Sequence, residues 1–189
     1  MPNLDIDQYP DGLIQLYRFD QDVEDFYLDI EFIGVEDDNL AMLVPEYFNQ
    51  FAAFAIDGTG SVMAFWFYNN ERSIEEAPIV YLDSEGGGTV VATTAQEFLS
   101  LLPYNTSFFS EAASHWVEWK EHPEITVPPA SHYTQEYYHS QLEYFTEAYP
   151  SYTDFRSWLR KEMKIQPDEN PFGTIVKNIE HYPTLPIEG

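Results

Sequence analysis

The sequence contains no cysteine and only 8 basic residues, against 33 acidic residues in a chain of 189. The absence of cysteine excludes disulfide bonds and thiolate chemistry, and it fits a reducing compartment. No run of about 18 apolar residues occurs, so no membrane-spanning helix is predicted. The first residues hold neither a basic segment nor an apolar run, so we predict no signal peptide and expect a cytoplasmic location.

The shortage of bases leaves a formal net charge of −25 at pH 7. A field of this size repels nucleic acids and anionic lipids, and it accelerates association with cationic partners. The charge is uneven: up to Asp38 there are twelve acids and one base, whereas from Thr126 onward nine acids face five bases. A protein that is merely soluble or salt-adapted remains one explanation. The asymmetry favours the other, a docking surface for a basic protein.

Apolar residues make up 44% of the chain and aromatic residues 17%, which is too rich in core-forming side chains for a disordered protein. The length fits one domain, or one domain with an extension. We therefore expect a folded protein with an aromatic core.

The first third of the chain shows the alternation of apolar and polar residues that is typical of strands. Residues 13–19 and 26–32 follow this period of two and are predicted to be strands, with residues 20–25 as an acidic turn between them. A helix over residues 20–30 is an alternative.

The central block predicts two hairpins. Residues 51–56 and 61–68 are apolar runs joined by a glycine-containing turn, and residues 78–83 and 89–93 form a second such pair. In the first turn, Asp57 is expected to cap its own turn, and Gly58 and Gly60 to supply its backbone geometry. These three are predicted to be structural residues.

Helices are predicted after the hairpins. A capping box at Thr94 opens a short helix, and a polar loop is expected over residues 104–130. Further helices are predicted over residues 138–149, from a second capping box at Ser151, and from Asn170 onward. The predicted fold class is α+β, with a central, mostly antiparallel sheet flanked by helices and a helical C-terminal extension. The expected organisation is a domain over residues 1–125 and an extension over residues 126–189 that packs on it.

Motifs for catalysis and for cofactor binding are not found in the sequence. There is no phosphate-binding loop with a Lys-Ser or Lys-Thr pair, and no Gly-x-Ser-x-Gly nucleophile motif. His132 and His139 could share a helix face, but surface histidines fit this spacing better than a zinc site. The acids between residues 20 and 31 resemble a calcium loop, but Asp25 stands where such a loop needs glycine. We expect no catalytic residue, no metal and no cofactor.

One part of the sequence resembles a known family. In order and spacing, it contains VPEYF, then FAIDGTGSVMAFWFY, then PIVYLDSEGGGTVVATTAQEFLSLL, which together span residues 44–102. This region is similar to the SUKH superfamily, a large bacterial group related to a yeast regulator of cell-wall glucan synthesis. The resemblance implies an α+β fold without catalytic residues. It also implies an immunity protein that neutralises a secreted toxin domain, often a nuclease, although some members are scaffolds or regulators.

Charge and resemblance lead to the same hypothesis. Nucleases bind a polyanion, so an inhibitor with many carboxylates complements their basic clefts. We expect a non-catalytic, acidic inhibitor of a basic, nuclease-type toxin domain that binds neither nucleic acid nor membrane; a general regulatory or scaffold module is the alternative, and an enzyme comes third. The predicted partner-facing residues are Asp20, Asp22, Glu24, Asp25, Glu36, Asp37, Asp38, Asp83 and Glu85, with Trp66 as an aromatic anchor.

Overall fold

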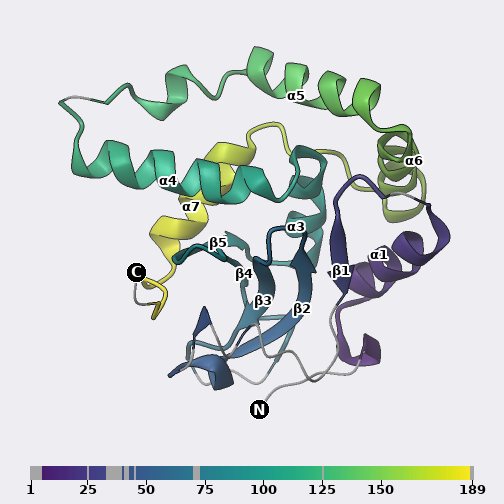
Figure 1. Ribbon diagram of the computed structural model, residues 1–189, viewed down its shortest axis with the longest axis horizontal. Coiled ribbons are helices and arrows are strands. Elements are labelled where there is room, and N and C mark those ends of the chain that lie inside the picture. Colours follow the sequence, from purple (N-terminus) through teal and green to yellow (C-terminus); the bar gives the residue numbers. More distant parts are fainter. Residues whose placement is uncertain are drawn as a thin grey trace.

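The protein has the predicted α+β fold, built on a five-stranded antiparallel sheet in which every strand pairs with its neighbour in the chain (Figure 1). The computed structural model describes residues 6–24, 26–32, 40, 43–44, 46–69, 73–124 and 126–187. The strands are β1 (Ile30–Phe32), β2 (Phe51–Asp57), β3 (Val62–Trp66), β4 (Ile79–Leu82) and β5 (Gly88–Ala92).

Both predicted hairpins are confirmed. Strands β2 and β3 pair through Ile56 and Val62 on either side of the Asp57 turn, and β4 and β5 pair through Leu82 and Gly88. Gly60 has a φ of 87°, a conformation that favours glycine. Gly58 does not have a positive φ; glycine is needed there because a Cβ would collide with the Asp29 carboxylate.

Helices cover one face of the sheet, and C-terminal helices form the outer part of this layer (Figure 1). The 3-10 helix η3 (Leu102–Tyr104) and the π-helix η5 (Leu159–Met163) continue two of the α-helices. Short 3-10 helices also occur at η1 (Ile6–Gln8), η2 (Phe48–Gln50) and η4 (Pro129–Ser131). The α-helices are α1 (Asp11–Asp22), α3 (Ala95–Leu101), α4 (Ser107–Glu121), α5 (Gln135–Ala148), α6 (Pro150–Trp158) and α7 (Pro171–His181).

The N-terminal strand prediction is wrong, because residues 13–19 lie within helix α1. Leu13 and Leu16 are fully buried, whereas Gln15 and Arg18 are exposed, so the burial follows a spacing of three and not of two. The predicted turn at 20–25 also starts inside this helix, which ends at Asp22. Of the second predicted strand, only Ile30–Phe32 is a strand.

The predicted loop at 104–130 is also wrong, since helix α4 occupies most of it. Its fully buried residues, Phe108, Phe109 and Ala112, all lie in its first two turns, and the second half of the helix mixes polar residues with Trp116, Val117 and Trp119. The capping box predicted at Ser151 does not form, because α6 begins one residue earlier at Pro150 and Ser151 lies inside the helix. By contrast, Asn170 caps α7 as predicted, accepting a hydrogen bond from the Gly173 backbone N–H at 3.2 Å.

The capping box at Thr94 is confirmed in one of its two bonds. The Thr94 hydroxyl accepts from the Glu97 backbone N–H at 3.1 Å. The Glu97 carboxylate, however, accepts from the backbone N–H of Thr93 at 2.6 Å, one residue earlier than a capping box requires. It also accepts from the fully buried Asn178 at 3.2 Å, which connects the start of α3 to α7.

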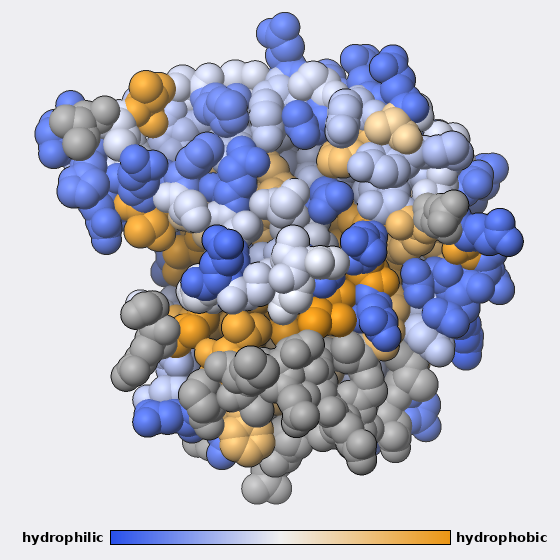
Figure 2. Space-filling model, in the orientation of Figure 1, coloured by the Kyte–Doolittle hydropathy of each residue, from blue (hydrophilic) through white to orange (hydrophobic). Residues whose placement is uncertain are grey.

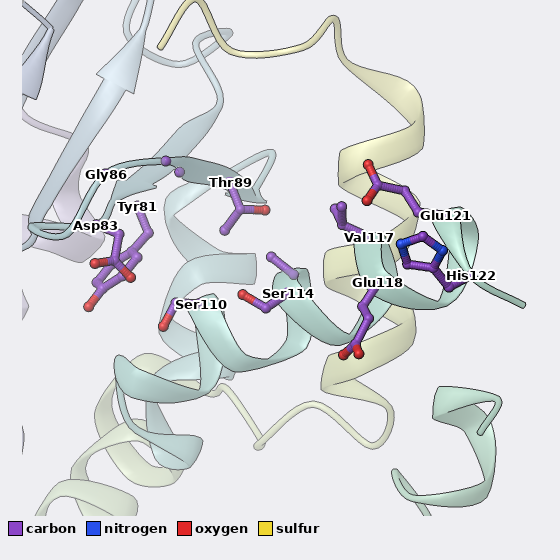
Figure 3. Close-up of a pocket in the computed structure, with 13 residues that line it drawn as sticks. Tyr81, Asp83, Gly86, Thr89, Ser110, Ser114, Val117, Glu118, Glu121 and His122 are labelled. Atoms are coloured by element: carbon purple, nitrogen blue, oxygen red, sulfur yellow. The ribbon is translucent and has the colours of Figure 1, made fainter. Parts of the chain in front are cut away.

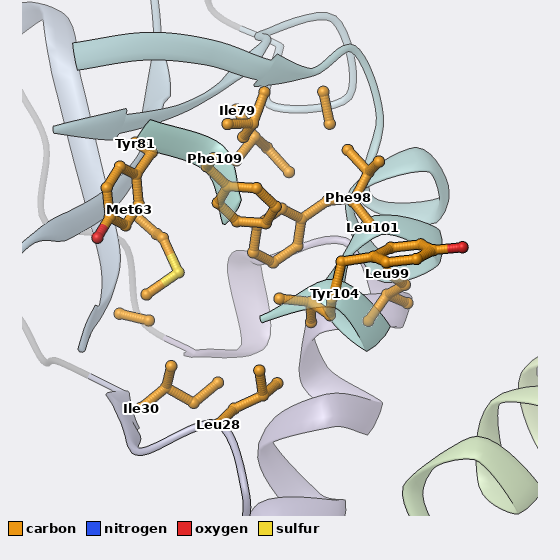
Figure 4. Packing of buried hydrophobic residues seen from close by; sticks show 14 of the residues in the cluster. Leu28, Ile30, Met63, Ile79, Tyr81, Phe98, Leu99, Leu101, Tyr104 and Phe109 are labelled. Carbon is orange, nitrogen blue, oxygen red and sulfur yellow. The ribbon is translucent and has the colours of Figure 1, made fainter. Parts of the chain in front are cut away.

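Aromatic side chains fill the core between the sheet and the helices, as the composition predicts. Phe98 of α3 and Phe109 of α4 lie 6.0 Å apart, measured between ring centroids, and both are fully buried (Figure 4). Buried residues from the N-terminal helix, the sheet and the C-terminal helices belong to this one cluster. A second cluster on the opposite face of the sheet includes Phe51 and Trp66.

Tyrosine hydroxyls connect helix η3 to the two ends of the chain. Tyr27 donates to the Leu102 carbonyl at 2.6 Å, and Tyr152 of α6 donates to the Pro103 carbonyl at 3.1 Å. Burial raises the pKa of Tyr152 to about 12, although the nearby Arg156 lowers it, and burial raises the pKa of Tyr27 well above its usual value. Both side chains are therefore held in the neutral form.

We expect the fold to lose stability as the pH rises above about 10. An unfolded tyrosine loses its proton near pH 10, whereas these folded tyrosines keep it to higher pH. The unfolded state then binds fewer protons than the folded state, so the free energy of unfolding falls between pH 10 and 12 and is unaffected by these groups below pH 9. Urea unfolding at pH 8 and at pH 11 measures this loss. Equal stability at both values would contradict it.

Candidate partner-binding groove

A groove of about 490 Å³ lies between the tip of the β4–β5 hairpin and helix α4. Ser110, Ser114, Val117 and Glu121 are spaced three and four residues apart, so they lie along one face of the helix and form one wall. The groove is lined by Tyr81, Asp83, Gly86, Gly87, Gly88, Thr89, Ser110, Ala113, Ser114, Val117, Glu118, Glu121 and His122.

The hairpin wall is fixed by hydrogen bonds within its turn. The Asp83 carboxylate accepts from the Glu85 backbone N–H at 2.9 Å, and the Gly86 N–H donates to the Asp83 carbonyl at 3.1 Å. Gly86 and Gly87 have φ values of 101° and 91°, which other residues rarely adopt. The Ser84 N–H donates to the Ser61 hydroxyl at 3.1 Å, so this turn is attached to the first hairpin.

The buried carboxylate of Asp57 connects the two walls. It accepts from the Tyr81 hydroxyl of the hairpin wall at 2.7 Å and from the Thr106 hydroxyl, just before α4, at 3.1 Å. It also accepts from the Thr59 and Ser61 backbone N–H groups of its own turn, at 3.0 and 3.2 Å. The sequence predicted that Asp57 caps its own turn, but it did not predict that the same carboxylate links the two walls of the groove.

Thr89 is the unusual polar residue of the groove. Its side chain is only 4% exposed, and its hydroxyl has no hydrogen-bond partner. A buried polar group without a partner costs free energy, and such groups in folded proteins often meet a ligand or water. Figure 3 shows Thr89 on the strand side of the groove, with Ser110 and Ser114 on the helix side.

The charged side chains of the groove are acidic. Asp83 lies at the hairpin end, Glu118 and Glu121 lie at the far end of α4, and no lysine or arginine is among the lining residues (Figure 3). Lys120, which is next to them in sequence, forms an ion pair with Glu180 of α7 at 3.5 Å. This is the one pair between a carboxylate and a lysine or arginine found in the described ranges. No lysine or arginine of the described residues therefore forms an ion pair with the carboxylates of the groove.

The predicted partner-facing residues do not come together on one surface. Asp83 lines the groove, and Glu85 is exposed at the same turn. Asp20, Asp22 and Glu24 lie at and just after the end of α1, on the other side of the molecule from the end of α4 (Figure 1). Asp25, Glu36, Asp37 and Asp38 lie outside the described residues.

Trp66 was predicted as an exposed anchor, and this prediction is wrong. The side chain is 2% exposed and stacks on Phe51 at 6.2 Å between ring centroids, on the sheet face opposite the helices. A partner cannot contact it without opening this second cluster. The aromatic pair instead stabilises the pairing of β2 with β3.

Sequence reasoning missed the α4 side of the groove. Glu118 and Glu121 fall in the segment that was predicted to be a loop, so their position opposite Asp83 could not be inferred. Ser110, Ser114 and Val117 have the spacing of a helix, but serine and alanine residues give this segment little contrast between apolar and polar positions, so the helical period is weak.

Hydrophilic side chains dominate the surface over α4, α5 and α6 (Figure 2).

In the described ranges, no group of three or more histidine, aspartate or glutamate side chains is arranged to hold a metal ion. No helix in the described part of the chain has the length and apolar character needed to cross a bilayer. Comparisons with known protein families, with curated proteins and with solved structures find no match for this chain.

Proposed function

We propose that this chain is a non-catalytic, acidic binding protein that neutralises a basic, nuclease-type bacterial toxin domain, and that the groove between the β4–β5 hairpin and α4 receives the partner. The observation that carries the proposal is the set of three carboxylates around the groove, with no lysine or arginine lining it. The resemblance of residues 44–102 to the SUKH superfamily supports the same role.

The groove can attract a cationic partner electrostatically, and it also gives that partner an apolar contact. Uncompensated carboxylates raise the rate at which a cationic partner meets this surface, and their effect weakens as salt rises. Val117, which is 46% exposed, gives an apolar patch on α4 between Ser114 and Glu121. An arginine or lysine of the partner that enters the groove would bring a donor to its carboxylates.

The test is binding to, and inhibition of, the toxin domain encoded beside the gene. We expect tight one-to-one binding, loss of the toxin's activity in the complex, and an association rate that falls steeply with salt concentration. The double variant Glu118→Gln/Glu121→Gln should lower the association rate about tenfold at low salt. Stopped-flow measurements at several salt concentrations give this rate.

A matched control removes two charges elsewhere. Glu136 and Glu143 are exposed on α5, so the variant Glu136→Gln/Glu143→Gln changes the net charge equally without touching the groove. It should alter the association rate much less than the groove variant. Equal effects of the two variants on the association rate would show that net charge alone accelerates binding, and would contradict the groove as the binding site. Recovery of endogenous regulatory proteins and no toxin in a pull-down would favour a regulatory or scaffold module.

A further inference from the structure

Basic residues are concentrated at one place in this acidic chain. Four of its 8 lysines and arginines fall within nine residues, where α6 continues into the π-helix η5. With Asp154 and Glu162, the segment 153–164 has four bases and two acids, a net charge of +2 in a chain of −25. The four basic residues are Arg156, Arg160, Lys161 and Lys164.

Two of these residues line a small pocket of about 190 Å³ between α5, α6 and the segment before α7. No carboxylate lines this pocket, although acids outnumber bases fourfold in the chain. Each polar lining side chain carries a hydrogen-bond donor, and that of Thr146 is already donated to the Leu142 carbonyl at 2.6 Å. The lining residues are Thr146, Thr153, Arg156, Ser157, Arg160, Gln166 and Pro167.

The arginines are placed without an internal counter-charge. Arg156 is half-buried, and its guanidinium carbon lies 5.6 Å from the centroid of the Tyr152 ring, a contact that limits its orientations. Neither Arg156 nor Arg160 forms an ion pair with a carboxylate of the described residues. They are four residues apart on one helical face, where like charges repel, so an anion between them would relieve this repulsion.

The volume of the pocket favours a small anion over a larger organic one. Pockets for organic ligands usually measure about 300–1,000 Å³, so a volume of 190 Å³ fits a small ion better. Guanidinium groups pair with phosphate oxygens through two parallel hydrogen bonds, and the Thr153 and Ser157 hydroxyls and the Gln166 amide can complete the shell. Arg160 also lies in a π-helix, a rare geometry that occurs frequently at functional sites.

We propose that this pocket binds a phosphate group, either free phosphate or the terminal phosphate of a small monoester. The site is separate from the groove, since α6 and the end of α4 lie at opposite ends of the helical layer (Figure 1). It does not depend on the function proposed for the groove. The four bases make the local potential more positive than elsewhere on this acidic chain, which favours the approach of an anion here.

Titration of the ¹⁵N-labelled protein with inorganic phosphate, at constant pH and ionic strength, tests the site. We expect saturable shifts of the Arg156 and Arg160 side-chain signals and a higher melting temperature with phosphate. A parallel titration with glycerol phosphate tests whether the pocket also binds a phosphate monoester. Binding of both compounds shows that the pocket accepts a monoester, whereas binding of inorganic phosphate alone identifies the free anion as the ligand.

Variants complete the test. Arg160→Gln changes an exposed side chain and should weaken phosphate binding about tenfold while leaving the circular dichroism spectrum unchanged. Lys177→Gln, an equal change of charge on α7, should leave phosphate binding as in the wild type. The proposal is overturned if phosphate gives no saturable shift, if sodium chloride gives the same shifts, or if Arg160→Gln binds phosphate unchanged.

Discussion

The Asp57→Ala variant should lose about 3 kcal/mol or more of its free energy of unfolding. Asp57 is 8% exposed and accepts from the hydroxyls of Tyr81 and Thr106, which are 3% and 5% exposed. Alanine leaves both hydroxyls buried without this acceptor, and it also removes the bonds that hold the β2–β3 turn. Each bond to a charged acceptor contributes about 1.5–3 kcal/mol, so several lost together outweigh most surface substitutions.

Urea unfolding followed by tryptophan fluorescence measures this loss. Asp83→Ala is the matched control, because its carboxylate accepts a single hydrogen bond within the described residues, from the exposed Glu85 N–H, and its loss should stay below about 1 kcal/mol. The double variant Asp57→Ala/Tyr81→Phe should be less destabilised than the sum of its single variants, since it removes the stranded Tyr81 hydroxyl. Strict additivity, or a loss of under 1 kcal/mol for Asp57→Ala, would show that the Tyr81 bond does not stabilise the fold.

The Phe155→Ala variant should lose about 3–5 kcal/mol, because it leaves a cavity where four aromatic rings meet. Phe155 of α6 is fully buried. Its ring centroid lies 5.3 Å from that of Phe26, 5.5 Å from that of Tyr27, 5.8 Å from that of Phe19 and 5.8 Å from that of Trp158. These contacts join the C-terminal helices to the N-terminal part of the chain.

The same variant tests how residues 126–189 relate to the rest of the chain. Because one cluster contains buried residues from both parts, we expect a single unfolding transition by far-ultraviolet circular dichroism and by tryptophan fluorescence. Tyr144→Ala, at a position that is 58% exposed on α5, should change the stability by less than about 0.5 kcal/mol. Two separate transitions in Phe155→Ala would contradict a shared core.

Sequence reasoning predicted the hairpins because turn chemistry is local. Gly60 and the apolar runs beside it indicate the β2–β3 hairpin without knowledge of the rest of the fold. Helix α1 was mistaken for a strand because Leu13 and Leu16 are separated by residues that also fit an alternating pattern. The choice between the two periods depends on which neighbours the helix meets, and that is a tertiary property.

The candidate groove was predicted on one side only. Asp83 and Glu85 were recognised in the second hairpin turn, where glycines indicate an exposed loop. The opposite wall requires α4 to run past this turn, and the position of the helix depends on the packing of Phe109 against Tyr81 of β4. The sequence likewise cannot predict that the Thr89 hydroxyl has no hydrogen-bond partner, because this depends on which groups surround the hydroxyl in the folded protein.

The order of the strands, β1-β2-β3-β4-β5, has a consequence for how the chain is made. Each strand meets its partner soon after it leaves the ribosome, so we expect the sheet to assemble while later residues are still being synthesised. Tyr27, Tyr104 and Phe108 are covered in part by rings of α5, α6 and the residues before α5, which are translated after the sheet. The nascent protein therefore exposes an aromatic surface until these helices have emerged, and its high negative charge keeps such chains apart.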